Sequence, residues 1–326
     1  MRRIIGIAWK VAALIAMAMA PAAFAQPAAY PERTVKLIVP FPPGGVTDIV
    51  GRIIAQRLSE GLGQTVYVEN LGGAAGTIGA ASAARARPDG YTLLMATATH
   101  AINATLMPNA GFDIQKDVVP VTLVASVPLL LAVNPSLPAN DVQGLVALAK
   151  KEPGKLNFAS GSTGSASHLA GEMLKSAAGI DMVHVPYKGG GPALQDLIAG
   201  HVSIMFENMP SILPYVQSGQ LRGLAVTSPK RSSAIPTLPT MIESGFPGFE
   251  AGSWYGLFAP PGTPPEVVEK LHGAMVKALA SPGMRTQLSK QGAEPIGNTP
   301  QEFAAFIRSE VAKWARVIQV SGAKAD

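Results

Sequence analysis

The stretch Val35-Lys36-Leu37-Ile38-Val39-Pro40-Phe41-Pro42-Pro43-Gly44-Gly45-Val46-Thr47-Asp48 indicates a strand–turn–helix unit, because an apolar β-rich run leads through a glycine turn into a helix start. The same order of features returns where Leu156-Asn157-Phe158-Ala159 is followed by Ser160-Gly161-Ser162-Thr163-Gly164-Ser165. The first N–H groups of a helix have no partner within it and lie at the positive end of its dipole. Each turn is therefore a candidate anion site, and the pair predicts one ligand held from two sides.

The alternation of strand and helix continues along the chain and favours an α/β fold. Strands are predicted at residues 35–39, 65–68, 91–95, 118–124, 129–133, 156–159, 182–185, 202–206 and 221–227. Helices are predicted at residues 48–61, 76–86, 142–151, 165–178, 192–199 and 210–218, and Phe303, Ile307, Val311, Trp314 and Ile318 recur at helical spacing. This order predicts a mainly parallel sheet with helices on both faces.

The N-terminus is typical of a secretory signal peptide. Arg2 and Arg3 precede the apolar stretch 11–19, and Ala23-Phe24-Ala25 is a small-x-small cleavage site. No later segment approaches about 18 uninterrupted apolar residues, so we expect the mature chain to be soluble in the periplasm. Cleavage would remove Arg2, Arg3 and Lys10 and lower the formal net charge from +5 to +2. That small excess gives no reason to expect nucleic-acid binding.

The chain contains no cysteine, so it has neither a disulfide framework nor thiolate chemistry. Its hydrophobic core must supply the stability, and a chain of about 300 residues is long enough to form two lobes. We predict a signal peptide at 1–25, a first lobe from 26–124 together with 227–326, and a second lobe at 125–226. Segments 121–133 and 224–228 would carry the chain across, and two crossings make a hinge with a cleft between the lobes.

The first turn offers Phe41, Pro43, Gly44, Gly45 and Asp48 as ligand-binding residues. Glycine lets the backbone approach a ligand closely, and proline stiffens that approach. Asp48 either caps the following helix or contacts a hydroxyl or amine of the ligand. Phe41 is either a core anchor or a wall beside the ligand.

The second turn offers hydroxyl groups besides its amides, from Ser160, Ser162, Thr163 and Ser165, and His168 lies one helical turn further on. The turn nearly matches the G-x-S-x-G nucleophile elbow, with serine at the first glycine position. A secreted serine hydrolase acting through Ser162 and His168 is therefore an alternative function. The other interpretation of His168 is a structural histidine, and no other histidine has the context of a catalytic base.

Further ligand-binding candidates follow other strands and turns. Tyr187 and Gly189 belong to a third glycine turn, and Gly76 to a fourth. Thr97 and Asn208 follow predicted strands, and ligands of open α/β sheets bind at the carboxyl ends of strands. Trp254 and Tyr255 either close the cleft or belong to the core, and Glu207 is expected to face solvent or a hinge partner. The sequence holds no complete dinucleotide or P-loop fingerprint and no metal-binding motif, so we expect no cofactor and no metal.

Seven blocks in order carry a resemblance that covers nearly the whole mature chain: FPPGGVTD (41–48), ENLGGAAGTIGA (69–80), RPDGYTLLMA (87–96), SGSTGSASHLAGEML (160–174), HVPYKGGGPALQDLIAGHV (184–202), LAVTSPKRS (224–232) and SWYGLFAPPGTPPEVVEKL (253–271). Together they resemble the Bug family, the extracytoplasmic solute receptors of tripartite tricarboxylate transporters. The resemblance implies a two-lobed periplasmic-binding fold of type II that closes over a small carboxylate. It also implies a non-enzymatic receptor whose partners are membrane transporter subunits, or alternatively a sensing system.

The ligand class implied by the resemblance is a di- or tricarboxylate, an amino acid or an aromatic acid. In this family the carboxylate is often held through backbone amides and ordered waters instead of arginine side chains. We expect a monomer.

Overall fold

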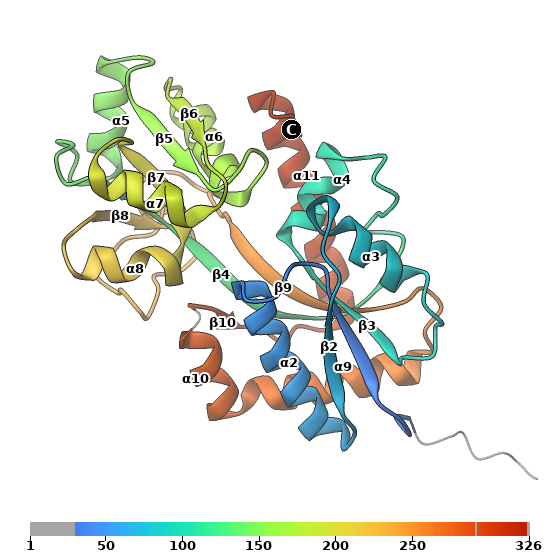
Figure 1. Cartoon of the computed structure of the whole chain (residues 1–326). Coiled ribbons are helices and arrows are strands. Elements are labelled where there is room, and N and C mark those ends of the chain that lie inside the picture. Colours follow the sequence, from blue (N-terminus) through green and yellow to red (C-terminus); the bar gives the residue numbers. More distant parts are fainter. Residues whose placement is uncertain (1–29, 291, 325–326) are drawn as a thin grey trace, which may run out of the picture. The chain divides into compact units, whose positions relative to one another are not determined.

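The computed structural model describes residues 30–290 and 292–324, so the predicted signal peptide lies outside the described residues. From Arg33 onward the chain forms one compact unit built on a ten-stranded sheet with flanking helices (Figure 1). The strand order is β2-β1-β3-β9-β4-β7-β5-β6, and β8 and β10 also pair with β4. The predicted α/β class is confirmed.

The first lobe begins with β1 (Val35–Val39), which pairs in parallel with β2 (Val66–Asn70) and β3 (Thr92–Thr97). Residues Ile38 and Leu94 point to one face, where α3 (Thr77–Ala84), α4 (Ala98–Leu106) and α11 (Pro300–Ser321) cover them. Val39 and Met95 point to the other face against Gly51 of α2 (Val46–Leu62), which packs with α9 (Pro265–Ala280) and α10 (Pro282–Lys290). Successive side chains of a strand point to opposite faces of the sheet, so both faces are buried under helices.

The second lobe has the same plan. Strand β5 (Asn157–Ser160) pairs in parallel with β6 (Val183–Pro186) and β7 (Ile204–Asn208). One face packs on α5 (Val142–Lys151) and α6 (Ala166–Ala178), and the other on α7 (Gly190–Ala199) and α8 (Met209–Gln217). Parallel pairing therefore holds within each strand–helix series, whereas the strands that join the lobes pair antiparallel.

The two lobes share one long strand, β4 (Val119–Val133). Its first part pairs with β9 (Gly252–Ala259) and the short β10 (Glu294–Pro295), and its last five residues pair with β7 and β8 (Arg222–Val226). The prediction of two separate strands at 118–124 and 129–133 was wrong. Pro128 lacks an N–H, but it is the last residue paired with β9 and keeps the extended backbone, so the strand continues through it.

The chain returns to the first lobe beside this strand. The hydroxyl of the buried Thr227 accepts from the N–H of Leu129 at 2.8 Å and contacts the carbonyls of Leu129 and Ala251. Helix α11 contacts both α4 and α6 through its predicted apolar face. Of the five predicted residues, Phe303, Ile307, Trp314 and Ile318 are buried, and Val311 is partly buried. Within the described residues, no helix has the length and apolar character needed to cross a membrane.

Candidate functional site

A cavity of about 290 Å³ lies where strand ends and helix starts from both lobes meet. The sheet edge contributes residues that follow or end β3, β5 and β7, as parallel strands do at the site of an open α/β sheet. Lining residues are Phe41, Thr47, Thr97, Ala98, Thr99, Ile102, Gly161, Ser162, Ser165, Ala166, Ser167, Gly189, Gly190, Glu207, Asn208, Ser253 and Tyr255. Six of the predicted ligand-binding residues therefore border one cavity: Phe41, Thr97, Ser162, Ser165, Gly189 and Asn208.

The helix starts of α4 and α6 give this cavity its donors. In α4 the Thr97 side chain accepts from the N–H of His100, and in α6 the Ser165 hydroxyl accepts from the N–H of His168. Each cap satisfies the third amide of its helix and leaves the first two, at Ala98 and Thr99 and at Ala166 and Ser167, without an intrahelical acceptor. Four N–H groups from two lobes thus belong to residues that line one cavity, at the positive ends of two helix dipoles.

No lysine or arginine is found among the described residues that line this cavity. Its one carboxylate is Glu207, which is 5 % exposed. Of the two positions expected for Glu207, the one facing solvent was therefore wrong, because the register of β7 turns the side chain against the start of α7. Tyr255 also lines the cavity, and burial raises its pKa to about 12 although a hydrogen bond with Thr47 opposes that shift. The phenol therefore stays neutral at pH 7 and remains a hydrogen-bond donor.

The first turn lies mostly outside the cavity, at its rim. Pro43, Gly44 and Gly45 are exposed, whereas Asp48 is buried and already has partners. The Asp48 carboxylate accepts from the Gly44 N–H at 3.0 Å, from Arg52 Nε at 3.0 Å and from Asn70 Nδ2 at 2.9 Å. Burial opposes ionisation of Asp48, but these hydrogen bonds and the Arg52 charge outweigh it and lower the pKa. Asp48 therefore fastens the turn, but it does not cap the helix as one interpretation expected, because Gly45 is the N-cap of α2 and no side chain makes a capping hydrogen bond there.

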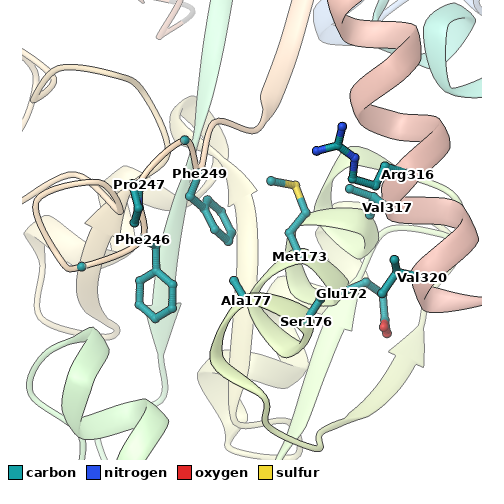
Figure 2. Close-up of a pocket in the computed structure, with 12 residues that line it drawn as sticks. Glu172, Met173, Ser176, Ala177, Phe246, Pro247, Phe249, Arg316, Val317 and Val320 are labelled. Carbon is teal, nitrogen blue, oxygen red and sulfur yellow. The ribbon is translucent and has the colours of Figure 1, made fainter.

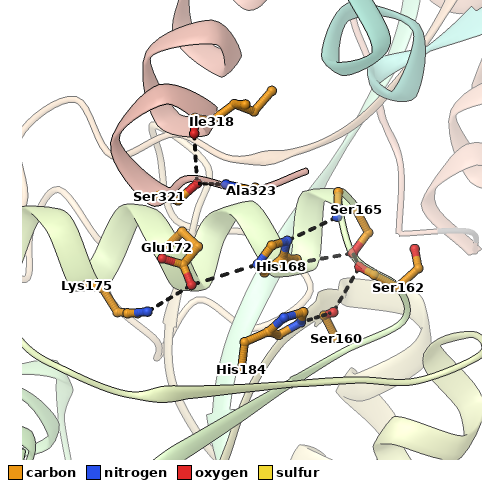
Figure 3. Close-up of polar contacts among 11 residues, drawn as sticks. Ser160, Ser162, Ser165, His168, Glu172, Lys175, His184, Ile318, Ser321 and Ala323 are labelled. Carbon is orange, nitrogen blue, oxygen red and sulfur yellow. Dashed lines mark hydrogen bonds and ion pairs between the residues drawn. The ribbon is translucent and has the colours of Figure 1, made fainter. Parts of the chain in front are cut away.

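Behind the second turn, the buried His168 and the partly buried His184 belong to one polar network (Figure 3). The Gly164 N–H donates to Nδ1 of His168 at 3.1 Å, so the proton is on Nε2, which faces Glu172 Oε1 at 3.8 Å. The His168 ring stacks on His184 with 3.8 Å between centroids. The fully buried Ser160 hydroxyl donates to the Ser162 carbonyl and accepts from His184 Nε2 at 2.7 Å.

This network gives the hydrolase alternative no support. Across residues 30–290 and 292–324, no hydrogen bond joins the Ser162 hydroxyl to His168, although a nucleophile and its base need that contact. Burial lowers the pKa of His168 to about 4, with smaller contributions from the charges of His184 and Lys175. His168 and Ser160 thus lie behind the cavity wall and hold the second turn in place.

Two more candidates also have protein partners. The Tyr187 hydroxyl donates to Asp196 Oδ2 at 2.6 Å, and burial together with that bond raises its pKa to about 12. Gly76 lies against His100 and Phe41, where an added Cβ would come within 3.0 Å of His100 Nε2. Both residues therefore support the wall from outside the cavity.

A second hollow of about 490 Å³ continues from the cavity and shares Phe41, Thr99, Ser162 and Ser165 with it. Thr163 lines this outer part, together with Ala74 and Ala75. These two alanines have φ values of 46° and 51°, a left-handed conformation that costs free energy in residues other than glycine. The Asn103 side chain holds the segment by donating to the Ala75 carbonyl at 3.1 Å.

A separate groove of about 380 Å³ lies away from these helix starts, between α6, residues 245–249 and α11 (Figure 2). Its walls are mainly apolar, from Met173, Ala177, Phe249, Val317 and Val320, with Arg316 and Glu172 at its rim. It contains none of the residues predicted to bind ligand. The smaller and more polar cavity is the better candidate site, because it gathers N–H donors from several chain segments.

Several lining residues were not predicted from the sequence as ligand-binding: Ala98, Thr99, Ile102, Ala166, Ser167, Gly190, Glu207 and Ser253. Thr47 and Gly161 belong to the two turns predicted to bind an anion, and closing the cleft was one of the two expectations for Tyr255. A signal existed for Ala166 and Ser167, because they directly follow the second turn. Ser253 and Tyr255 are separated from the other lining residues by more than forty positions, and only the pairing of β9 with β3 and β4 brings them there.

Comparison with known proteins gives one family and several relatives of similar length. Residues 50–323 match the model of the tripartite tricarboxylate transporter family receptor. Protein BugT of Bordetella pertussis is 40% identical over 320 residues, which cover 97% of this chain and 98% of BugT.

Two solved structures with ligands are also similar. R. palustris Rpa4515 with adipate is 39% identical, with a TM-score of 0.78 over 90% of this chain and 99% of that protein. MatC from Rhodopseudomonas palustris with bound malate is 35% identical, with a TM-score of 0.73 over 89% of this chain and 100% of that one.

Proposed function

The chain belongs to the tripartite tricarboxylate transporter receptor family, and on that premise we propose that its cavity binds a small carboxylate for delivery to a membrane transporter. The observation that carries the proposal is the set of four capped-helix N–H groups around one cavity without lysine or arginine among its described lining residues. Two relatives with solved structures hold adipate and malate, which are dicarboxylates of different length. We propose a carboxylate of this class as the ligand.

The energetics support binding by amides alone. A hydrogen bond to a charged group contributes roughly 1.5–3 kcal/mol net. Micromolar binding corresponds to a free energy of about −8 kcal/mol. Four such bonds are of the size needed to supply it after the cost of association is subtracted. Thr99 and Ser162 line the same cavity and carry hydroxyl groups that can supply further donors, whereas the Ser253 hydroxyl already donates to Asn208 Oδ1 at 3.1 Å.

Closure of the cleft is the second part of the proposal. Thr99 and Ser253 lie on the first-lobe side of the cavity, whereas Ser162 and Asn208 lie on the second-lobe side. We propose lobes at 26–124 with 227–326 and at 125–226, which rotate about β4 and the return segment near Thr227. A ligand held by both lobes favours the closed arrangement, since it binds that state more tightly. The closed surface would then be recognised by the transporter's membrane subunits.

Export is part of the same proposal. Residues 1–25 would direct secretion and be removed, which would place the receptor in the periplasm as a monomer that binds without catalysis. The receptor family supports a binding role.

A thermal-shift screen tests the proposed function. Purified protein, unfolded and refolded to release any retained ligand, is heated with mono-, di- and tricarboxylates and with the matched amides. We expect at least one carboxylate to raise the melting temperature, because a ligand at about 100 times its Kd adds about 2.7 kcal/mol of stability. Its amide, which lacks the charge, is expected to give no shift. The proposal is contradicted if no carboxylate stabilises the protein, or if the acids are chemically altered during incubation.

A further inference from the structure

Glu207 places a carboxylate in the wall of a cavity that is otherwise built to hold an anion. It is the fourth residue of β7 and is 5 % exposed, so water solvates it only from the cavity side. A buried carboxylate costs free energy unless it has a partner. The position of Glu207 therefore calls for a partner.

Its contacts satisfy one of its two oxygens. Oε1 accepts from the backbone N–H of Asn208 at 2.7 Å and from Asn208 Nδ2 at 3.1 Å. Oε2 lies beside the start of α7, where a Cβ added at Gly190 would come within 2.7 Å of it. No lysine, arginine or histidine of the described chain forms an ion pair with Glu207. Oε2 is thus the oxygen left for a ligand.

The Asp48 carboxylate and the Tyr187 phenol, two further groups predicted to contact the ligand, do not compete for this role. Asp48 is bonded to Gly44, Arg52 and Asn70, and the Tyr187 hydroxyl is bonded to Asp196. Burial raises the pKa of Glu207, and the two bonds from Asn208 oppose that shift. A donor on the ligand would oppose it further, because hydrogen bonds to a carboxylate favour the charged form.

We propose that the ligand is a carboxylate that also carries a hydrogen-bond donor, a hydroxyl or an ammonium group, and that Glu207 accepts from that donor. The inference rests on the proposed function. The ligand carboxylate lies at the starts of α4 and α6, because Glu207 repels a second negative charge at the start of α7. The donor then faces Oε2, and a ligand without it leaves that oxygen unsatisfied. Glu207 is therefore a specificity-determining residue of the site.

Calorimetric titration with matched acids tests this inference. Each set keeps the carbon skeleton and changes one substituent: succinate, malate and aspartate; glutarate, 2-hydroxyglutarate and glutamate; propionate, lactate and alanine. We expect a donor-bearing acid of at least one set to bind about tenfold or more tightly than the unsubstituted acid, the effect of one hydrogen bond to a charged group. Comparison of the hydroxyl with the ammonium acid of that set identifies the donor.

The variant E207Q removes the charge and keeps the shape, and we expect it to lose most of the preference while still binding the unsubstituted acid. Glu310→Gln is the matched control, since Glu310 is also buried but lies on α11 and does not line the cavity. Glu207→Asp, the second variant, keeps the charge and is expected to retain more of the preference than E207Q.

Equal affinities within every set, or an unchanged preference in both Glu207 variants, would overturn the inference and leave the proposed function standing. If none of these acids binds and no carboxylate stabilises the protein in the thermal screen, both the inference and the proposed function fail.

Discussion

Replacement of Gly161 by valine is expected to weaken carboxylate binding by about 100-fold or more, which corresponds to about 2.7 kcal/mol. An added Cβ at this position would lie 3.0 Å from the N of Gly190 and 3.2 Å from the carbonyl carbon of Gly189. Both neighbours are backbone atoms, so the start of α7 must move, and the 2.7 Å bond from the Gly189 N–H to the Gly161 carbonyl is strained. The branched side chain would also enter the cavity. Calorimetric titration of the variant measures the loss.

The matched control for this variant is Gly273→Val in α9, where an added Cβ meets no atom within 4 Å. We expect it to bind as the wild type does. Gly161 lies at the end of β5 outside the hydrophobic core, so the far-ultraviolet circular dichroism of Gly161→Val should match that of the wild type. An affinity within about threefold of wild type in a folded Gly161→Val protein would mean that the turn is an ordinary connection.

Acidification between pH 6.5 and pH 4 is expected to destabilise the protein through His100 and His168. Burial lowers the pKa of each ring to about 4, against 6.5 in the unfolded chain. Below pH 6.5 these two histidines therefore bind protons in the unfolded chain but not in the native protein. The free energy of unfolding falls as a result until the pH reaches about 4. Each histidine accounts for up to about 3 kcal/mol of this loss. Protonation of His168 at Nδ1 would also break the hydrogen bond from the Gly164 N–H, because two donors would then face each other.

Urea unfolding at pH 7, 6, 5 and 4.5 measures this effect for the wild type and for His100→Gln and His168→Gln. Each variant is less stable at pH 7, but it should lose less free energy of unfolding than the wild type as the pH falls. His201→Gln, at an exposed ring, is the control for removal of a histidine. The assignment is wrong if both buried-site variants lose as much stability as the wild type over this range.

Local sequence signals correctly predicted a helix where its capping residue and its apolar spacing indicate the same bounds. Helix α5 runs from Val142 to Lys151 as predicted, because the Asp141 side chain caps it by accepting from the Gly144 N–H. Helix α4 was missed, since residues 98–106 show no clear apolar period and its capping box uses His100 in place of the usual glutamate or glutamine. Strand β9 was also missed, although its aromatic residues were noted, because its partners β3 and β4 are distant in sequence.

For the candidate site too, local patterns indicated some residues and long-range contacts decided others. Thr97, Ser162, Ser165 and Asn208 follow or end strands, and that position alone indicates the sheet edge where the cavity lies. Asp48 and Tyr187 were predicted as ligand contacts, but their polar atoms already form hydrogen bonds within the protein. Asn70 donates to Asp48, and Tyr187 donates to Asp196. These hydrogen-bond partners are too far away in the sequence for a local pattern to indicate them. The burial of Glu207 depends on how β7 pairs with β4 and how α7 packs, so the sequence left open whether the side chain faces solvent or a hinge partner.

In the proposed receptor, backbone amides of α4 and α6 hold one ligand carboxylate. A crystal structure of the protein with the acid that stabilises it most in the thermal screen would locate that carboxylate. We expect carboxylate oxygens within hydrogen-bond distance of backbone N–H groups among Ala98, Thr99, Ala166 and Ser167, in the cavity that Glu207 borders. A ligand found in the groove lined by Met173, Phe249 and Val317, or held through lysine or arginine side chains, would contradict it.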